Sequence, residues 1–168
     1  MDGKVVWKSE MAPCTNLAIE LININIREDI MDGKLTWKNG MSFNALTDSG
    51  FSMTLDASVD HGGANEGPRP MELFLVGLGG CTAMDVISIL QKKRQEVTNF
   101  EILLHGDRAT DHPKVFTEIT VEFVVTGKNI DPEAVKRAVE LSETKYCSAN
   151  AMLSKTAKIK TKVTVKEA

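Results

Sequence analysis

Two cysteines carry the most informative chemistry in this chain. Cys81 follows the glycine-rich run 77–80, and Cys147 stands in the segment Lys145-Tyr-Cys-Ser148. A thiolate attacks peroxide bonds, and a second thiol nearby can condense with the resulting sulfenic acid to form a disulfide. The alternative is that each cysteine is only a small hydrophobic core residue. From the residues alone both interpretations stay open for Cys81 and Cys147, and we interpret Cys14 as incidental.

Charged residues around Cys81 are candidates for tuning its reactivity. A reactive thiol needs positive charge or hydrogen-bond donors that stabilise the thiolate, and Arg69 and Lys145 are such cations. Glu72, nine residues before Cys81, could activate the thiol in its own or a neighbouring subunit, or could simply favour the first turn of a helix. Asp85 lies four residues after Cys81, and we expect it to bridge another element or to orient a group in the site.

The sequence predicts neither a metal nor another cofactor. The three histidines are scattered, and Cys81 and Cys147 are 66 residues apart with no Cys-x-x-Cys pair, so no zinc-ligand spacing is present. The glycines at 77, 79 and 80 lie within a predicted helix, not between a strand and a helix, which argues against a phosphate-binding loop.

Composition restricts the class of protein and its partners. The chain has 168 residues, 42% hydrophobic and 26% charged, which suits one sizeable core. A net charge of −3 argues against a nucleic-acid or anionic-membrane partner. No secretory segment is evident at the start, and the apolar run from Leu73 to Met84 is short for a bilayer. We therefore expect a cytoplasmic protein, in which a disulfide would be transient.

Hydrophobic periodicity predicts an α+β domain. A helix opens at Pro70, runs to residue 94 and is apolar all round, which predicts burial. Its glycines predict the close approach of another backbone, such as a second helix. That second helix begins near Asp131 and ends at or before Cys147. The loop 58–70 precedes the first helix, and strand candidates cover residues 34–38, 43–47, 51–57, 100–105, 119–125 and 158–165.

A short sequence motif occurs twice near the start of the chain. Residues 1–11 read MDGKVVWKSEM and residues 31–41 read MDGKLTWKNGM. Two copies are too few for a repeat architecture, which needs at least three to bury a continuous face. We interpret residues 1–30 as an N-terminal extension with a candidate strand at 17–26, and residues 31–168 as the domain.

The segments around both cysteines resemble the OsmC/Ohr family, the osmotically inducible and organic-hydroperoxide-resistance proteins. The run from Gly67 to Leu90 resembles the family's central helix, and the segments 145–153 and 112–117 resemble its second cysteine region and the approach to a long strand. The resemblance covers about residues 31 to 165. It implies a sandwich of antiparallel sheet wrapped around a buried central helix, in an intertwined homodimer with its sites at the subunit interface.

The same resemblance implies a function. Cys81 would be the peroxidatic cysteine that attacks an organic hydroperoxide, and Cys147 the resolving cysteine. An external dithiol, such as a lipoylated protein, would reduce the pair again. Apolar side chains near Cys81, such as Phe74 and Met84, would then favour an apolar hydroperoxide as substrate.

The chain departs from the hydroperoxide-resistance branch at two positions. That branch uses a strand arginine and a glutamate to activate the thiol, and these positions fall near Met41 and on Met71, with no arginine between residues 28 and 68. We therefore expect a less characterised OsmC-like branch. Two alternatives stay open: a non-enzymatic protein that binds a small apolar ligand or senses redox state, and a hot-dog-like thioesterase whose activity would not need the cysteines.

Overall fold

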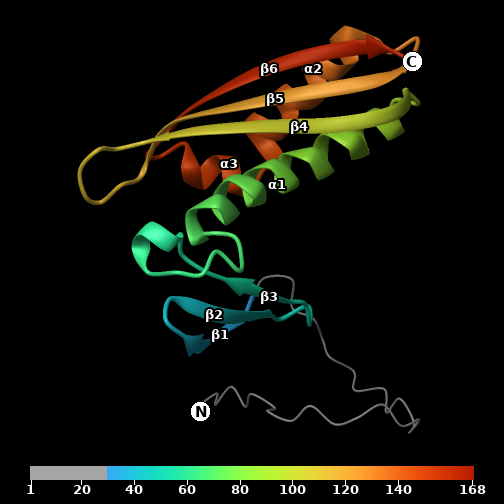
Figure 1. Ribbon diagram of the computed structural model, residues 1–168. Helices are drawn as coiled ribbons and strands as arrows, with labels where there is room; N and C mark the ends of the chain where they lie inside the picture. The colour runs from blue at the N-terminus through green and yellow to red at the C-terminus, as the bar shows by residue number, and fades with distance from the viewer. Residues whose placement is uncertain (1–29) are drawn as a thin grey trace, which may run out of the picture. The chain divides into compact units, whose positions relative to one another are not determined.

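The computed structural model describes residues 30–168, and the compact unit Gly33–Ala168 holds the helices and strands given below (Figure 1). The candidate strand at 17–26 and Cys14 lie outside the described residues. The boundary between an extension and a domain near residue 31 remains a prediction.

The strands form two three-stranded sheets. The first has the order β1-β2-β3 and is antiparallel, and the second has the order β4-β5-β6. The predicted strands are confirmed, but only β4 and β5 are antiparallel in the second sheet, because β6 runs parallel to β5. A parallel neighbour requires a crossover, and the helical segment between β5 and β6 supplies it. The strands are β1 Gly33–Asn39, β2 Ser42–Thr47, β3 Ser52–Leu55, β4 Glu96–Arg108, β5 Phe116–Lys128 and β6 Lys158–Glu167.

Helix α1, Pro70–Lys92, begins where the sequence predicts (Figure 1). Pro70 occupies the first turn, where its missing N–H costs nothing, and Arg69 and Glu72 form a reciprocal capping box. By length and composition α1 is apolar enough to cross a membrane. In this fold, however, one face of α1 packs against β4, α2 and α3. The helix is therefore a core element of the domain.

The burial of α1 differs from the predicted all-round burial. Leu78, Val86 and Leu90 are buried, whereas Phe74 and Met84 are 55% and 73% exposed in the single chain. The glycines also differ from expectation. A Cβ on Gly79 would lie 2.7 Å from the Leu104 side chain of β4, whereas a Cβ on Gly77 or Gly80 would have no atom of another described element within 4 Å. The neighbour that approaches Gly79 is thus the end of a strand side chain, and the predicted close approach of a second helix backbone is not found there.

The second helical region follows β5. It consists of α2, Pro132–Leu141, a π-helical turn at Ser142–Tyr146, and α3, Ser148–Leu153. Asp131 caps α2 as predicted, since its side chain accepts a hydrogen bond from the Glu133 backbone N–H. The core between α1, α2 and the second sheet includes Leu78, Val86, Leu90, Ile119, Val121, Phe123, Val125, Val135 and Ala138.

Candidate functional site

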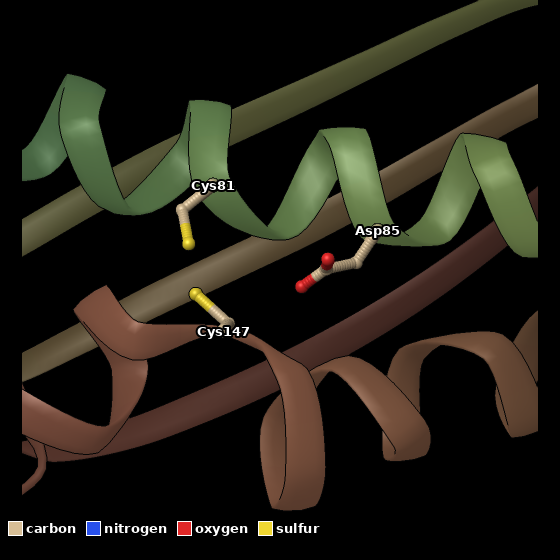
Figure 2. A group of neighbouring side chains, drawn as sticks. All are labelled: Cys81, Asp85 and Cys147. Carbon is tan, nitrogen blue, oxygen red and sulfur yellow. The ribbon is translucent and has the colours of Figure 1, made fainter. Parts of the chain in front are cut away.

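The fold brings the two predicted redox cysteines together. Cys81 lies in the middle of α1, and Cys147 lies between the π-helical turn and α3. The two sulfurs and one carboxylate oxygen of Asp85 all lie within 4.8 Å of one another. Figure 2 shows the two sulfurs facing each other across the gap between the helical segments, with the Asp85 carboxylate beside them. A disulfide, with an S–S bond of about 2.0 Å, requires the two sulfurs to approach by no more than about 2.8 Å.

Cys147 is held as a buried thiol. It is 3% exposed, and its Sγ accepts a hydrogen bond of 3.3 Å from the backbone N–H of Asn150. Burial is the main cause that raises the pKa of Cys147 to about 11, and the hydrogen bond with Cys81 and the charge of Asp85 act in the same direction. Cys147 is therefore protonated at neutral pH.

Cys81 is the more accessible of the two sulfurs. The residue Cys81 is partly exposed on α1, whereas Cys147 is buried. We therefore expect a reagent in solvent to reach Cys81 before Cys147. The two cysteines thus differ in their access to solvent.

A buried hydrogen-bond chain fixes the helical segments around the cysteines. Ser142 Oγ donates to Asp85 Oδ2 at 2.9 Å and lies 2.8 Å from Thr82 Oγ1. Ser142 has one hydroxyl proton, which it gives to Asp85, so Thr82 is the donor to Ser142. The expectation that Asp85 bridges another element is confirmed. The sequence analysis did not single out Ser142 and Thr82 as site residues. Each is a hydroxyl on an otherwise apolar helix face, and this pattern could have indicated that the two side chains meet.

Arg69 and Glu72 pair with each other and not with a cysteine. Arg69 Nη1 lies 2.8 Å from Glu72 Oε1, and the Arg69 backbone N–H donates to Glu72 Oε2 at 2.9 Å. The pKa of Glu72 is lowered mainly by that backbone hydrogen bond, and next by the hydrogen bond from the Arg69 guanidinium. Nine residues of continuous helix correspond to about 13 Å of rise, so within one chain this pair is distant from Cys81. Lys145 is also engaged elsewhere, 5.3 Å from the centre of the Tyr146 ring.

A separate cavity lies at the N-terminal end of α1. Its volume is about 720 Å³, and Arg69 and Glu72 line it together with Arg108 and His61. The rest of its wall is mainly apolar, and neither cysteine contributes to it. Phe74 and Met84, the predicted substrate-contacting residues, do not line it either. The other lining residues are Leu35, Met41, Phe43, Leu55, Asp56, Ala57, Ser58, Pro70, Met71, Leu75, Gly106 and Phe116.

Asp56 organises the loop that forms one side of this cavity. It is 2% exposed, and its carboxylate accepts hydrogen bonds from the backbone N–H groups of Ala57, Ala64 and Glu66 at 2.8, 2.9 and 3.1 Å. The hydrogen bond from the Glu66 backbone N–H is the main cause that lowers the pKa of Asp56. The loop between β3 and α1 is thus built around one ionised carboxylate.

Known proteins share this fold and much of this sequence. Residues 62–162 match the family model described as OsmC-like protein. Protein YhfA of Escherichia coli K12 is 40% identical over 129 residues, which are 77% of this chain and 93% of YhfA.

Two solved structures extend the comparison. A hypothetical protein from Aquifex aeolicus is 35% identical with a TM-score of 0.74, over 83% of this chain and 98% of its own. An organic hydroperoxide resistance protein from Legionella pneumophila shares the fold at 14% identity and a TM-score of 0.63, over 80% of this chain and 96% of its own. With the family model matching more than half of the sequence, the chain belongs to the OsmC-like protein family.

Proposed function

We propose that this protein is a thiol-dependent peroxidase that reduces organic hydroperoxides through Cys81 and Cys147. The observation that carries the proposal is the pairing of a partly exposed sulfur with a buried one within 4.8 Å. The family also contains proteins described as organic hydroperoxide resistance proteins, such as that of Legionella pneumophila, which supports the class of substrate.

The reaction follows from the positions of the two sulfurs. The Cys81 thiolate attacks one peroxide oxygen, the O–O bond breaks, and the alkoxide leaves and takes up a proton as alcohol. Cys81 is then a sulfenic acid. The Cys147 sulfur attacks it, the S–O bond breaks, and water leaves as the disulfide forms. An external dithiol such as a lipoylated protein returns both cysteines to thiols, and no cofactor takes part.

Asp85 and the burial of Cys147 give the two cysteines different roles in this cycle. Burial, and to a smaller extent the Asp85 charge, favour the protonated form of Cys147. Cys147 is therefore a poor nucleophile toward free peroxide, and it reacts only once the sulfenic acid stands beside it. This separation protects the resolving thiol from oxidation by solvent peroxide.

Residues outside the sulfur pair complete the proposal in a homodimer. The exposed apolar side chains of the single chain are the surface that a second subunit would cover. In such a dimer Arg69 and Glu72 would act on the partner's Cys81, as thiolate-stabilising cation and activating carboxylate. Phe74 and Met84 would meet an apolar hydroperoxide, in a cytoplasmic protein. The exposed apolar residues include Leu35, Trp37, Phe51, Phe74, Val76 and Met84.

Turnover with the two cysteine variants tests this function. Consumption of cumene hydroperoxide with dihydrolipoamide as reductant should be lost in Cys81→Ser, because no sulfur reaches the peroxide. Without the reductant, Cys147→Ser should reduce one equivalent and stop at a sulfenic acid that a dimedone probe captures. Cys14→Ser is the matched control and should keep full activity. Equal turnover in Cys81→Ser and the wild type would refute the proposal.

The cavity favours a second candidate, a protein that binds a small apolar ligand. Its wall is mainly apolar, and Arg69 and Arg108 could hold a polar or acidic end of the ligand. Native mass spectrometry of the purified protein should then show a bound small molecule that Gly106→Leu displaces. A bound ligand together with no hydroperoxide consumption would favour this candidate over the peroxidase.

A further inference from the structure

The Cys81, Asp85 and Cys147 side chains form a ligand set that sequence spacing concealed. Cysteines 66 residues apart give no zinc signature along the chain. The fold nevertheless places two sulfurs and a carboxylate oxygen within 4.8 Å of one another, on α1 and on the turn before α3 (Figure 2). Among the described residues, these three side chains form the one group of three potential metal ligands whose ligand atoms lie close together.

We propose that the reduced protein binds a thiophilic divalent cation, Zn²⁺, through Cys81, Cys147 and Asp85. Tetrahedral zinc has Zn–S distances of about 2.3 Å and Zn–O distances of about 2.0–2.2 Å, which place two sulfur ligands about 3.8 Å apart and a sulfur and an oxygen about 3.5 Å apart. All three atoms lie within 4.8 Å of one another, so their separations exceed those of a zinc site by no more than about 1.3 Å. Small side-chain rotations close the remaining gap.

The surroundings of the three ligands suit a metal. Metal-bound carboxylates in proteins are themselves held by hydrogen bonds, and here Ser142 donates to Asp85 Oδ2 while Thr82 lies behind Ser142. A carboxylate has further lone pairs, so this bond leaves Asp85 free to bind zinc. Cys147 is buried, and Cys81 and Asp85 are partly exposed, so an ion has a path of entry from solvent.

Three protein ligands leave one of the four tetrahedral positions for water or an external ligand. The metal replaces the thiol protons, since thiolates and not thiols bind zinc. Bound zinc would therefore occupy both sulfurs needed for a disulfide. The site would hold the reduced pair in a protected form and would exist only while the pair is reduced.

Oxidation of the pair must release the ion. A hydroperoxide takes two electrons from the two thiolates, its O–O bond breaks, and two protons complete one alcohol and one water. The sulfurs join as a disulfide and Zn²⁺ leaves with its charge unchanged. This release by hydroperoxide rests on the proposed function, whereas binding of zinc by the reduced pair requires only the geometry.

Metal titration of the full chain in the Cys14→Ser background tests the site. The reduced, metal-free protein is titrated with Co²⁺ and then with Zn²⁺ against a chromophoric chelator. We expect one ion per chain, a sulfur-to-cobalt charge-transfer band, and loss of that band on addition of zinc. Cys81→Ser and Cys147→Ser should lose the band, and Asp85→Asn should weaken zinc binding at least 10-fold. Asp111→Asn, an exposed carboxylate elsewhere, should bind like its parent.

Oxidants then separate this inference from the proposed function. Diamide accepts two electrons and two protons from a dithiol, so it should release zinc stoichiometrically as the disulfide forms. Release by diamide but not by cumene hydroperoxide would uphold the metal site and overturn the release by hydroperoxide, whereas loss of thiols from the metal-free protein on addition of hydroperoxide tests the peroxidase separately. Absence of the cobalt band, or zinc affinity in Cys81→Ser equal to that of its parent, would overturn the metal site whatever the peroxide does.

Discussion

Ser142 donates a hydrogen bond of 2.9 Å from its buried hydroxyl to the Asp85 carboxylate, and it thereby joins the π-helical turn to α1. The turn leads directly into Cys147, and Asp85 lies one helical turn after Cys81. The bond therefore fixes the separation of the two sulfurs through the backbone segments that carry them. Since Ser142 is fully buried, water cannot replace it.

Ser142→Ala should destabilise the protein by about 1–3 kcal/mol, because it leaves Asp85 and Thr82 without their partner in a poorly hydrated place. Urea denaturation of the reduced protein, with circular dichroism as the readout, measures the change. Ser154→Ala removes an exposed hydroxyl and should change stability by no more than about 0.5 kcal/mol. A Ser142→Ala effect no larger than this control would show that the chain of hydroxyls is not structural.

The stability of the reduced protein should fall in alkaline solution because of Cys147. Its pKa is about 11 in the folded protein against an ordinary value of 9.0, so the folded state keeps the proton to a higher pH than the unfolded state does. The contribution is complete below pH 9 and is lost as the pH rises to 11. The loss of unfolding free energy over this pH range amounts to about 2–3 kcal/mol.

Comparison with Cys147→Ala isolates this contribution from other groups that titrate in the same range. The difference in unfolding free energy between the wild type and Cys147→Ala should shrink from pH 8 to pH 11 under reducing conditions. Urea denaturation at each pH supplies both values. A difference that stays constant over this range would mean that Cys147 ionises at its ordinary pH.

Alkylation should distinguish the two sulfurs. Iodoacetamide reacts with exposed thiolates, and Cys147 is 3% exposed and protonated, so Cys81 should be modified at least about tenfold faster at pH 8. Peptide mass spectrometry after timed quenching gives both rates. In urea the two rates should become similar, which is the control for intrinsic reactivity. Faster modification of Cys147 in the folded protein would reverse the assigned roles.

The loop beside the cavity should depend on ionised Asp56. Asp56→Asn places an amide nitrogen against at least one of the three backbone N–H groups that the carboxylate binds, so it should destabilise the protein near neutral pH. The pKa of Asp56 is lowered from 3.8, so its stabilising effect is present above that pH and is lost as the pH falls through the lower folded value.

Denaturation of the wild type and Asp56→Asn between pH 3 and pH 7 tests this dependence. The stability difference should be constant from pH 5 to pH 7 and should narrow below about pH 4. Asp60→Asn, in the same loop but exposed, should show no such trend. An equal trend in both variants would assign the effect to net charge and not to the Asp56 hydrogen bonds.

Local signals in the sequence predicted the elements well. Pro70 and the pair Asp131-Pro132 mark helix starts through fixed φ angles and an N-cap, which depend only on neighbouring residues. The alternation of apolar and polar residues along β5 and β6 is likewise a local signal, because successive residues of a strand face opposite sides of the sheet. The direction of β6 was predicted wrongly, since an antiparallel sheet was expected and β6 runs parallel to β5. Strand pairing is decided by the path of the whole chain, which local patterns do not specify.

The site was only partly accessible from the sequence. The meeting of Cys81 and Cys147 was inferred through resemblance to a family, since a separation of 66 residues says nothing about distance in space. Arg69 was expected near a thiol, but a capping box with Glu72 satisfies it locally. The Ser142 bond to Asp85 depends on the rotation of two helical segments about their axes, which no periodicity specifies.

The most direct test of the Cys81–Cys147 redox pair is a count of free thiols, with intact mass, before and after one equivalent of cumene hydroperoxide. In the reduced Cys14→Ser background we predict the loss of two thiols and about two mass units, and a peptide map should join Cys81 to Cys147. The same treatment of Cys81→Ser should leave Cys147 as a free thiol. Thiols that stay free in the parent protein at a modest excess of hydroperoxide would contradict the proposed peroxidase.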